Sequence, residues 1–141
     1  MKKLTLLLTL SMMSSFVAVA QQNDDYAKKA NKVGVQTKES QLAITPQRAL
    51  QNLKNGNARF ASGQSINQRK YRQQVSLTAK GQYPYAAILS CLDSRVAVED
   101  IFDLNNGDSF NGRIAGNVMN PDMLGSFEFA TKLAGAKVIM V

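Results

Sequence analysis

The sequence predicts an α/β protein with a parallel, mixed-edge central sheet that is flanked by helices and preceded by a helical arm. Three short apolar segments, at residues 85–90, 109–115 and 137–141, alternate with segments of helical spacing. Strand–helix alternation of this kind is typical of parallel sheets. Apolar residues make up 45% of the 141 residues, which is enough for a packed core.

The expected helices have recognisable ends. At residues 45–62, Thr45 can cap the helix, Pro46 suits its first position, and Gly63 offers a stop. Its apolar face is narrow, so this helix must dock on something. A short helix is expected at 98–104, and a third begins at Asn120-Pro121-Asp122 and ends at Gly135. Residues 65–80 are polar and basic, and no structure is predicted for them.

The first twenty residues resemble a secretory signal peptide. Lys2 and Lys3 precede an apolar run at 4–10, and small residues at 18–20 suit cleavage near Ala20. The alternative is a membrane anchor, but the stretch 4–20 is interrupted by Thr and Ser and is shorter than the roughly 20 apolar residues that a span needs. We expect a periplasmic or secreted protein without stable membrane insertion. Residues 21–44 then form a polar linker or arm, and 45–141 the folded domain.

Charge is unevenly distributed along the chain. Residues 21–82 hold eleven Lys and Arg against three Asp and Glu, whereas residues 83–141 hold four against seven. A basic front part can bind nucleic acid or another anionic surface. It has few aromatic residues and no nucleic-acid-binding motif, so we predict no nucleic-acid partner.

The cysteine and histidine counts exclude several kinds of site. With one Cys and no His, the 141 residues can form no internal disulfide, no Ser-His-Asp triad and no histidine metal site. The remaining candidates for chemistry are Cys91, Asp93 and Arg95, which follow the first apolar strand at alternate positions. Ligand sites of open α/β sheets form at this end of strands.

These three residues suit a metal site. A thiolate is a good zinc ligand, a carboxylate two residues away can orient a metal-bound water, and an arginine can hold that carboxylate ionised. Two alternatives remain open on these residues alone. They are a buried cysteine beside a surface ion pair, and a reactive redox cysteine whose pKa is lowered by Arg95.

From about residue 45 to residue 141 the sequence resembles the β-carbonic anhydrase family. The resemblance rests on several motifs in the expected order and at the expected separations. They are Gly56-Asn57-Ala58-Arg59-Phe60, Gly81-Gln82-x-Pro84, Cys91-Leu92-Asp93-Ser94-Arg95-Val96, Gly107-Asp108-x-Phe110, Arg113-x-Ala115-Gly116-Asn117 and Ser126-x-Glu128-x-Ala130.

The resemblance implies zinc-dependent, reversible hydration of carbon dioxide to bicarbonate in a homodimer or larger oligomer. It implies that Cys91 ligates zinc, and that Asp93 either accepts a hydrogen bond from the metal-bound hydroxide or ligates the metal itself. Arg95 would pair with Asp93. Gln82 would bind substrate at the subunit interface, with the front helix on the neighbouring subunit. Phe110 and Ala115 would line the carbon dioxide pocket; for these two, plain core packing is the alternative.

The chain departs from the family pattern at three places. The family's other zinc ligands form a His-x-x-Cys segment that would fall just beyond Val141, so we expect a C-terminally truncated copy with little or no activity. Phe129 stands where many members have tyrosine, and Ile114 where asparagine is common. The alternative function is a non-catalytic, exported, basic binding or thiol module.

Overall fold

Three parallel strands lie at the centre of the structure, a computed structural model that describes residues 33–66 and 71–141. The strands are β1 (Ala86–Ser90), β2 (Ser109–Arg113) and β3 (Val138–Met140). Their order in the sheet is β2-β1-β3, and β1 pairs in parallel with both neighbours. The predicted parallel α/β sheet is therefore confirmed. The expected mixed edge is not seen, because the described ranges contain no antiparallel strand.

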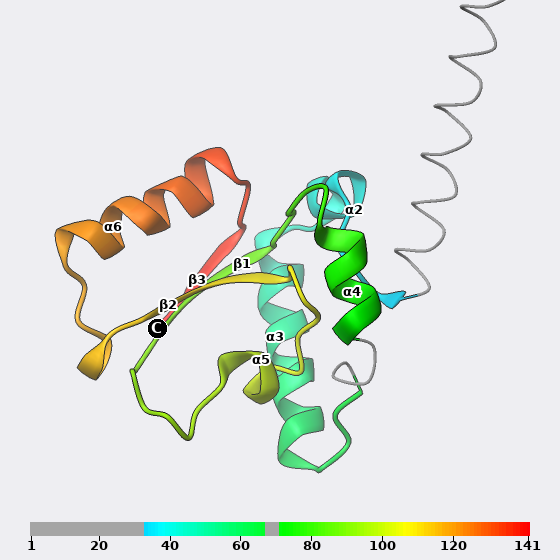
Figure 1. Ribbon diagram of the computed structural model, residues 1–141, viewed down its shortest axis with the longest axis horizontal. Helices are drawn as coiled ribbons and strands as arrows, with labels where there is room; N and C mark the ends of the chain where they lie inside the picture. The colour runs from blue at the N-terminus through cyan, green and yellow to red at the C-terminus, as the bar shows by residue number, and fades with distance from the viewer. Residues whose placement is uncertain (1–32, 67–70) are drawn as a thin grey trace, which may run out of the picture.

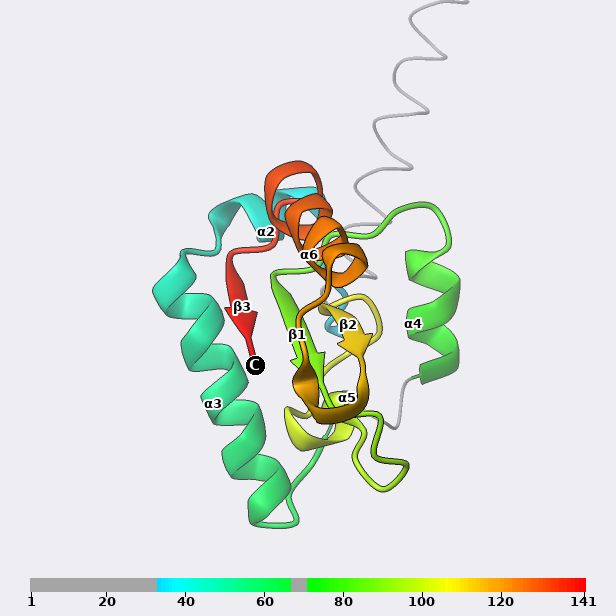
Figure 2. The same cartoon turned by 90° about the vertical axis from the view of Figure 1, so that its left-hand side faces the viewer.

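Helices cover both faces of this sheet, as Figures 1 and 2 show. The helices that pack on it are α3 (Pro46–Ala61), α5 (Val98–Ile101) and α6 (Pro121–Glu128). The side chains of β1 alternate between the two faces. Ala86 and Ile88 join a cluster with α3 and α5, whereas Ala87 and Leu89 join a cluster with α6. All five residues of β1 are buried, as expected for the central strand of a parallel sheet.

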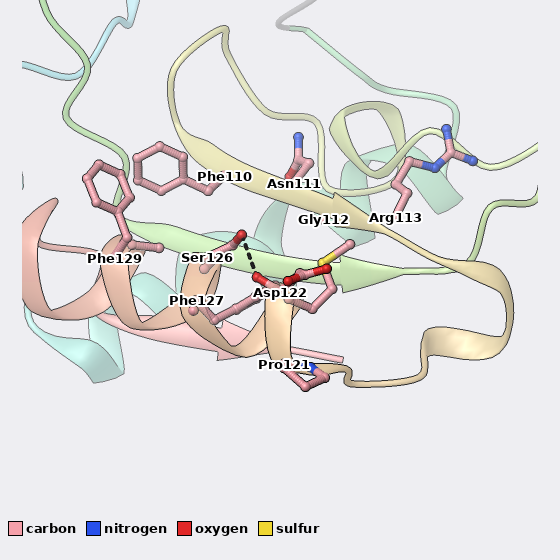
Figure 3. A pocket seen from close by; sticks show the side chains of 13 residues that line it. Phe110, Asn111, Gly112, Arg113, Pro121, Asp122, Ser126, Phe127 and Phe129 are labelled. Carbon is pink, nitrogen blue, oxygen red and sulfur yellow. Dashed lines mark hydrogen bonds between the residues drawn. The ribbon is translucent and has the colours of Figure 1, made fainter.

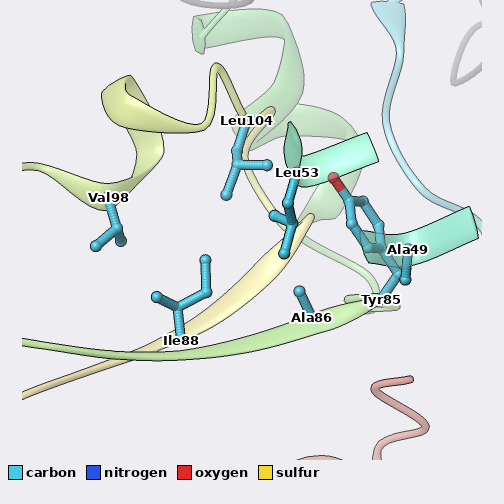
Figure 4. Close-up of a cluster of buried hydrophobic side chains, with 7 residues drawn as sticks. All are labelled: Ala49, Leu53, Tyr85, Ala86, Ile88, Val98 and Leu104. Carbon is cyan, nitrogen blue, oxygen red and sulfur yellow. The ribbon is translucent and has the colours of Figure 1, made fainter. Parts of the chain in front are cut away.

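Helix α3 begins and ends as predicted. The side chain of Thr45 accepts a hydrogen bond from the Arg48 N–H at 3.2 Å, and Gly63 beyond the other end has a φ of +70°. Ala49 and Leu53 on its apolar face are fully buried. Figure 4 shows them above Ala86, so this narrow face docks on the chain's own sheet.

Two helices lie in segments for which the sequence predicts no regular structure. They are α2 (Lys38–Ala43) and α4 (Tyr71–Thr78). Thr37 and Ser40 form a capping box at the start of α2. Gln41 then donates hydrogen bonds to the carbonyl groups of Pro84 at 2.7 Å and Ala134 at 2.8 Å. The described part of the expected linker is therefore a helix attached to the domain.

Helix α3 lies unusually close to the end of α5. A Cβ atom added to Gly56 would lie 1.8 Å from the Phe102 carbonyl oxygen, so only glycine fits there. Asn57 donates to the Ile101 carbonyl oxygen at 3.1 Å, and the Arg59 Nε atom lies 2.5 Å from Asp103 Oδ2. The Asp103 side chain is fully buried. These contacts fix α5, which directly follows the loop that carries Cys91.

Helix α6 ends earlier than predicted. Asn120 caps it through a 2.8 Å bond from the Met123 N–H, and from Phe129 to Leu133 the chain forms a π-helical turn, η3. Gly135 then follows with a φ of +82°. A Cβ atom at Gly112 would lie 3.0 Å from side chains of α6, so this glycine lets α6 approach β2.

The predicted signal peptide and its cleavage position, at residues 1–20, lie outside the described residues and stay predictions. Within the described ranges, no helix is both long enough and apolar enough to cross a membrane. The predicted boundary between arm and domain at residues 44 and 45 also stays a prediction.

Candidate functional site

The predicted site lies where the chain leaves two neighbouring parallel strands. Residues 91–97 connect β1 to α5 on one face of the sheet, whereas residues 114–120 connect β2 to α6 on the other face. Loops that leave adjacent strands toward opposite faces open a crevice at the carboxyl ends of those strands. The topology therefore places Cys91 and Asp93 at the position where α/β proteins bind ligands.

Asp93 and Arg95 form the pair that their spacing predicts. The Arg95 side chain donates from Nε to Asp93 Oδ1 at 3.0 Å and from Nη2 to Oδ2 at 2.7 Å. The Arg95 backbone N–H also donates to Oδ1, at 3.0 Å. These bonds lower the pKa of Asp93 to about 2, first through the guanidinium group and then through the backbone N–H. Asp93 is therefore ionised at neutral pH.

Cys91 is a free thiol at the end of β1, and it is half-buried. Its Sγ atom accepts a hydrogen bond from the Gly116 N–H at 3.4 Å. This bond, and weaker ones from the N–H groups of Asp93 and Leu92, lower the pKa of the thiol below its usual value. The backbone N–H groups, and not Arg95 as the spacing suggested, lower the pKa of Cys91. A thiolate in this position can act as a metal ligand or as a nucleophile.

Arg113 joins the site, although no role is predicted for it from the sequence. From the last position of β2, its Nε donates to the Cys91 carbonyl oxygen at 3.1 Å, and its Nη2 donates to the Asp93 carbonyl oxygen. One guanidinium group thus holds the backbone on both sides of Leu92. The only sequence signal was its place in the Arg113-x-Ala115-Gly116-Asn117 motif, because the contact spans 22 residues.

The predicted substrate residues do not all lie together in one chain. Ala115 lies two residues beyond the end of β2, at the Cys91 end of the sheet and next to Gly116. Gln82 precedes β1, and Phe110 pairs with Ala87 near the start of that strand. Parallel strands place their starts at one edge and their ends at the other. Gln82 and Phe110 therefore lie at the opposite end of the strands from Cys91.

A cavity of about 800 Å³ lies between β2 and α6. Phe110 and Phe129 form one wall with an edge-on contact between their rings, whose centres are 5.9 Å apart. Figure 3 shows both rings at one end of the cavity and the Arg113 guanidinium group turned away from α6. Cys91 and Asp93 do not line it. Phe110 lines this cavity, and Arg113 lines it as well as contacting the Cys91 loop. The predicted role of Phe110 in binding carbon dioxide stays a prediction.

Known proteins are similar to this chain in sequence. The sequence model of the family described as "Carbonic anhydrase" matches residues 86–141. The carbonic anhydrase of Mycolicibacterium smegmatis is 38% identical over 96 residues, which are 68% of this chain and 47% of that protein. Carbonic anhydrase 2 of Mycobacterium tuberculosis is 41% identical over 96 residues, which are 68% of this chain and 46% of that protein.

These matches support the β-carbonic anhydrase family, which the sequence motifs predict. It spans about half the length of the curated carbonic anhydrases that it matches. Among solved structures, the β-carbonic anhydrase CafA of Aspergillus fumigatus is similar with a TM-score of 0.44 and 31% identity, over 60% of this chain and 41% of that one. A tetrameric β-carbonic anhydrase of Sordaria macrospora gives a TM-score of 0.43 and 22% identity, over 61% and 44%.

The residues present do not by themselves fit the zinc ion that the β-carbonic anhydrase family implies. Cys91 offers a thiolate, but both carboxylate oxygens of Asp93 are bonded to Arg95. Within residues 33–66 and 71–141, no three side chains of His, Cys, Asp or Glu are grouped to hold a metal ion. A catalytic zinc site has three protein ligands and an open position. Cys91 and Asp93 form at most part of such a site.

Proposed function

We propose that this chain supplies the Cys91 part of a zinc-dependent carbonic anhydrase site, which interconverts carbon dioxide and bicarbonate. The observation that carries the proposal is an ionised, arginine-held carboxylate two residues from a thiol whose sulfur accepts a backbone hydrogen bond. This pair lies at the carboxyl ends of β1 and β2, in a chain 38% and 41% identical to two carbonic anhydrases.

Each residue of this group has a proposed task. Cys91 is one zinc ligand. Arg95 keeps the Asp93 carboxylate ionised and fixes its orientation, so that Asp93 can accept a hydrogen bond from a bound hydroxide. Arg113 holds the loop between them in one conformation. The 141 residues contain no histidine and no second cysteine, so the His-x-x-Cys ligands that the family resemblance implies are not among them.

A chimera tests the proposal. The part of the M. smegmatis carbonic anhydrase that follows the matched region is joined after Val141, and zinc content and carbon dioxide hydration are measured. We expect about one zinc ion per chain, as a single catalytic site requires, and hydration above the buffer rate. Cys91→Ser should abolish both, whereas Lys132→Gln on the exposed side of the π-helical turn should change neither. A folded chimera that binds zinc equally well with Cys91→Ser would refute the role of Cys91.

We also propose that a second copy of the chain completes the substrate site. Gln82 and Phe110 lie at the far end of the strands from Cys91, so another copy must supply them if they act there. Mixing chimeras that carry Cys91→Ser and Gln82→Ala separately tests this. Hydration should be low in each alone and should rise on mixing, because mixed dimers contain one intact site. Activity that stays at the level of the separate variants would contradict a shared site.

Export is the third part of the proposal. The charged start, the apolar run and the small residues at 18–20 support a cleavable signal peptide. Expression of the whole chain in a Gram-negative host, followed by mass measurement of the periplasmic fraction, should show a protein that begins near Gln21. A full-length protein confined to the cytoplasm would argue against export.

The second candidate is an exported thiol module without catalysis. It is favoured by the accessible, backbone-stabilised thiol of Cys91, the sole cysteine. The chimera separates the two candidates, because a thiol module would acquire neither stoichiometric zinc nor carbon dioxide hydration when the ligand-bearing segment is supplied.

A further inference from the structure

A cluster of polar side chains joins three segments on the side of the molecule away from Cys91. The Asn105 side chain donates to the Gly34 carbonyl oxygen at 2.9 Å and to Asp108 Oδ2 at 3.2 Å. Its own oxygen accepts a hydrogen bond from Gln74 of α4 at 2.6 Å. One amide thus connects residues 33–37, helix α4 and the loop 104–108, and we refer to these contacts as the polar junction.

Helix α4 is attached to the domain through this junction. Gln74 is its only buried residue, and the Gln74 oxygen also accepts from the Asn106 N–H at 3.0 Å. Asn106 in turn donates to the Thr78 hydroxyl at 2.7 Å. The large apolar residues Tyr71 and Val75 are 60% and 44% exposed. An element with so little apolar burial opens more readily than the core.

The junction is built around a buried carboxyl group. Asp108 is 4% exposed, and its Oδ2 atom accepts from the Asn105 N–H at 2.9 Å and from the Asn105 side chain. Its Oδ1 atom has no hydrogen-bond partner among the described residues. Burial raises the pKa of Asp108 to about 7, and the hydrogen bonds from Asn105 and from the Gln36 side chain only partly oppose this.

The groups around Asp108 do little to offset the cost of burying its ionised form. From the start of β1, the Tyr85 phenol interacts with Asp108, and the Asp108 charge helps to raise the pKa of Tyr85. Arg59 of α3 acts on Tyr85, but it pairs with Asp103. The partners of Asp108 from residues 33–37 and loop 104–108 are the uncharged amides Gln36 and Asn105, and Gln74 of α4 contacts Asn105.

We propose that the polar junction is a pH-sensitive latch, which holds α4 and residues 33–37 on the domain while Asp108 is neutral and releases them when Asp108 ionises. The latch opens because water solvates the carboxylate better than the buried site does. The closed form binds the Asp108 proton more tightly than the open form does. In the open form the carboxyl group has its ordinary pKa near 4. The equilibrium constant for opening the latch therefore rises about tenfold per pH unit from about pH 4 to about pH 7, and it is constant above that.

Hydrogen exchange on the 141-residue chain tests the latch. Protection of the amides of residues 34–37 and 71–78 is compared with that of β1 between pH 5 and pH 8, after correction for intrinsic exchange. We expect the first two segments to lose protection by about 50-fold or more while β1 stays protected, as the tenfold dependence per pH unit requires. Unchanged protection, simultaneous loss in β1, or no protection in these segments at pH 5 would each overturn the proposal.

Two variants serve as a matched pair. Asp108→Asn removes the titrating group while keeping its shape, and it should abolish the pH dependence. Asp122→Asn makes the same charge change at an exposed position of α6 and should preserve it. Should Asp108→Asn fail to fold, carboxyl carbon NMR on the unmodified chain decides instead. A titration midpoint of Asp108 near 7 supports the latch, whereas one near 4 overturns it.

Discussion

Asp93 and Arg95 interact through three hydrogen bonds, although the Arg95 side chain is 85% exposed. An exposed ion pair contributes little to the free energy of folding. Its effect is on the orientation and ionisation of the carboxylate. Contacts at both Asp93 oxygens and from the backbone leave this side chain one well-defined position, as a group that accepts a hydrogen bond in a reaction requires.

Arg95→Gln tests how the carboxylate is kept ionised. Loss of the guanidinium group should raise the pKa of Asp93 from about 2 toward the ordinary value near 4, because the largest stabilising bond is gone. Carboxyl carbon NMR measures this. Lys132→Gln removes the exposed Lys132–Glu128 ion pair and should leave the pKa of Asp93 unchanged. If Asp93 still titrates near 2 in Arg95→Gln, the backbone N–H must suffice.

The Asp93–Arg95 pair also makes the stability of the fold decrease at acid pH. A carboxyl group with a folded-state pKa near 2 stabilises the fold above its unfolded-state pKa near 4. This contribution is lost as the pH falls from about 4 to about 2. Arg95→Gln should therefore reduce the acid sensitivity of the free energy of unfolding in that window.

At the scale of single residues, the sequence predicts contacts between residues that are close in the chain. The Asp93–Arg95 pair follows from alternate positions after a strand. The Arg113 contact to the Cys91 carbonyl group does not, because it depends on the parallel register that places Arg113 beside Ser90. The stabilisation of the thiol by Gly116 also depends on this register.

Among the helices, α3 and α5 pack so closely that a single hydrogen atom at Gly56 decides the fit. Gly56→Ala would place a Cβ atom 1.8 Å from the Phe102 carbonyl oxygen, so the helices must separate. We expect a loss of at least about 2 kcal/mol in the free energy of unfolding, measured by urea denaturation. Gly125→Ala in α6 meets nothing within 4 Å and should stabilise by up to about 1 kcal/mol. Equal effects of the two changes would disprove the close contact.

Helix α2 depends on one buried amide. Gln41→Glu replaces the donor to Pro84 and Ala134 with an acceptor, so a carboxylate faces two carbonyl groups. The expected loss is about 2 kcal/mol or more near neutral pH, and it should diminish as the pH falls toward about 4, because a carboxyl group that faces two carbonyl groups takes up its proton above its ordinary pKa. The control is Gln51→Glu, at an exposed position of α3, with an expected effect within about 0.5 kcal/mol. A pH-independent loss would contradict this account.

These buried amides explain why helices α2 and α4 could not be predicted from the sequence. Helix α3 has an N-cap, a first-turn proline and apolar residues at regular spacing, so its ends could be predicted. Helices α2 and α4 are attached through Gln41 and Gln74, whose partners lie 93 and 31 residues away. A polar side chain gives no periodic signal of burial, and its partners are known only once the sheet is formed.

The whole molecule combines a nearly regular sheet with an incomplete metal site. We predict that the purified chain of 141 residues binds far less than one zinc ion per chain, because one or two ligands do not make a tetrahedral site. Elemental analysis after dialysis measures this, and stopped-flow hydration of carbon dioxide should stay at the buffer rate. A content near one ion per chain would contradict the prediction and would point to ligands shared between copies.

The burial of Tyr85 in the cluster between β1 and α3 also has a spectroscopic consequence. The chain has no tryptophan and four tyrosines, so its near-ultraviolet absorption and emission come mainly from tyrosine. Burial, and secondly the Asp108 charge, raise the pKa of the Tyr85 phenol above its ordinary value. During an alkaline titration, tyrosinate absorbance from Tyr85 will therefore appear late, as the core around it opens. The chain carries its own optical reporter of unfolding at the centre of the fold, and no label has to be introduced.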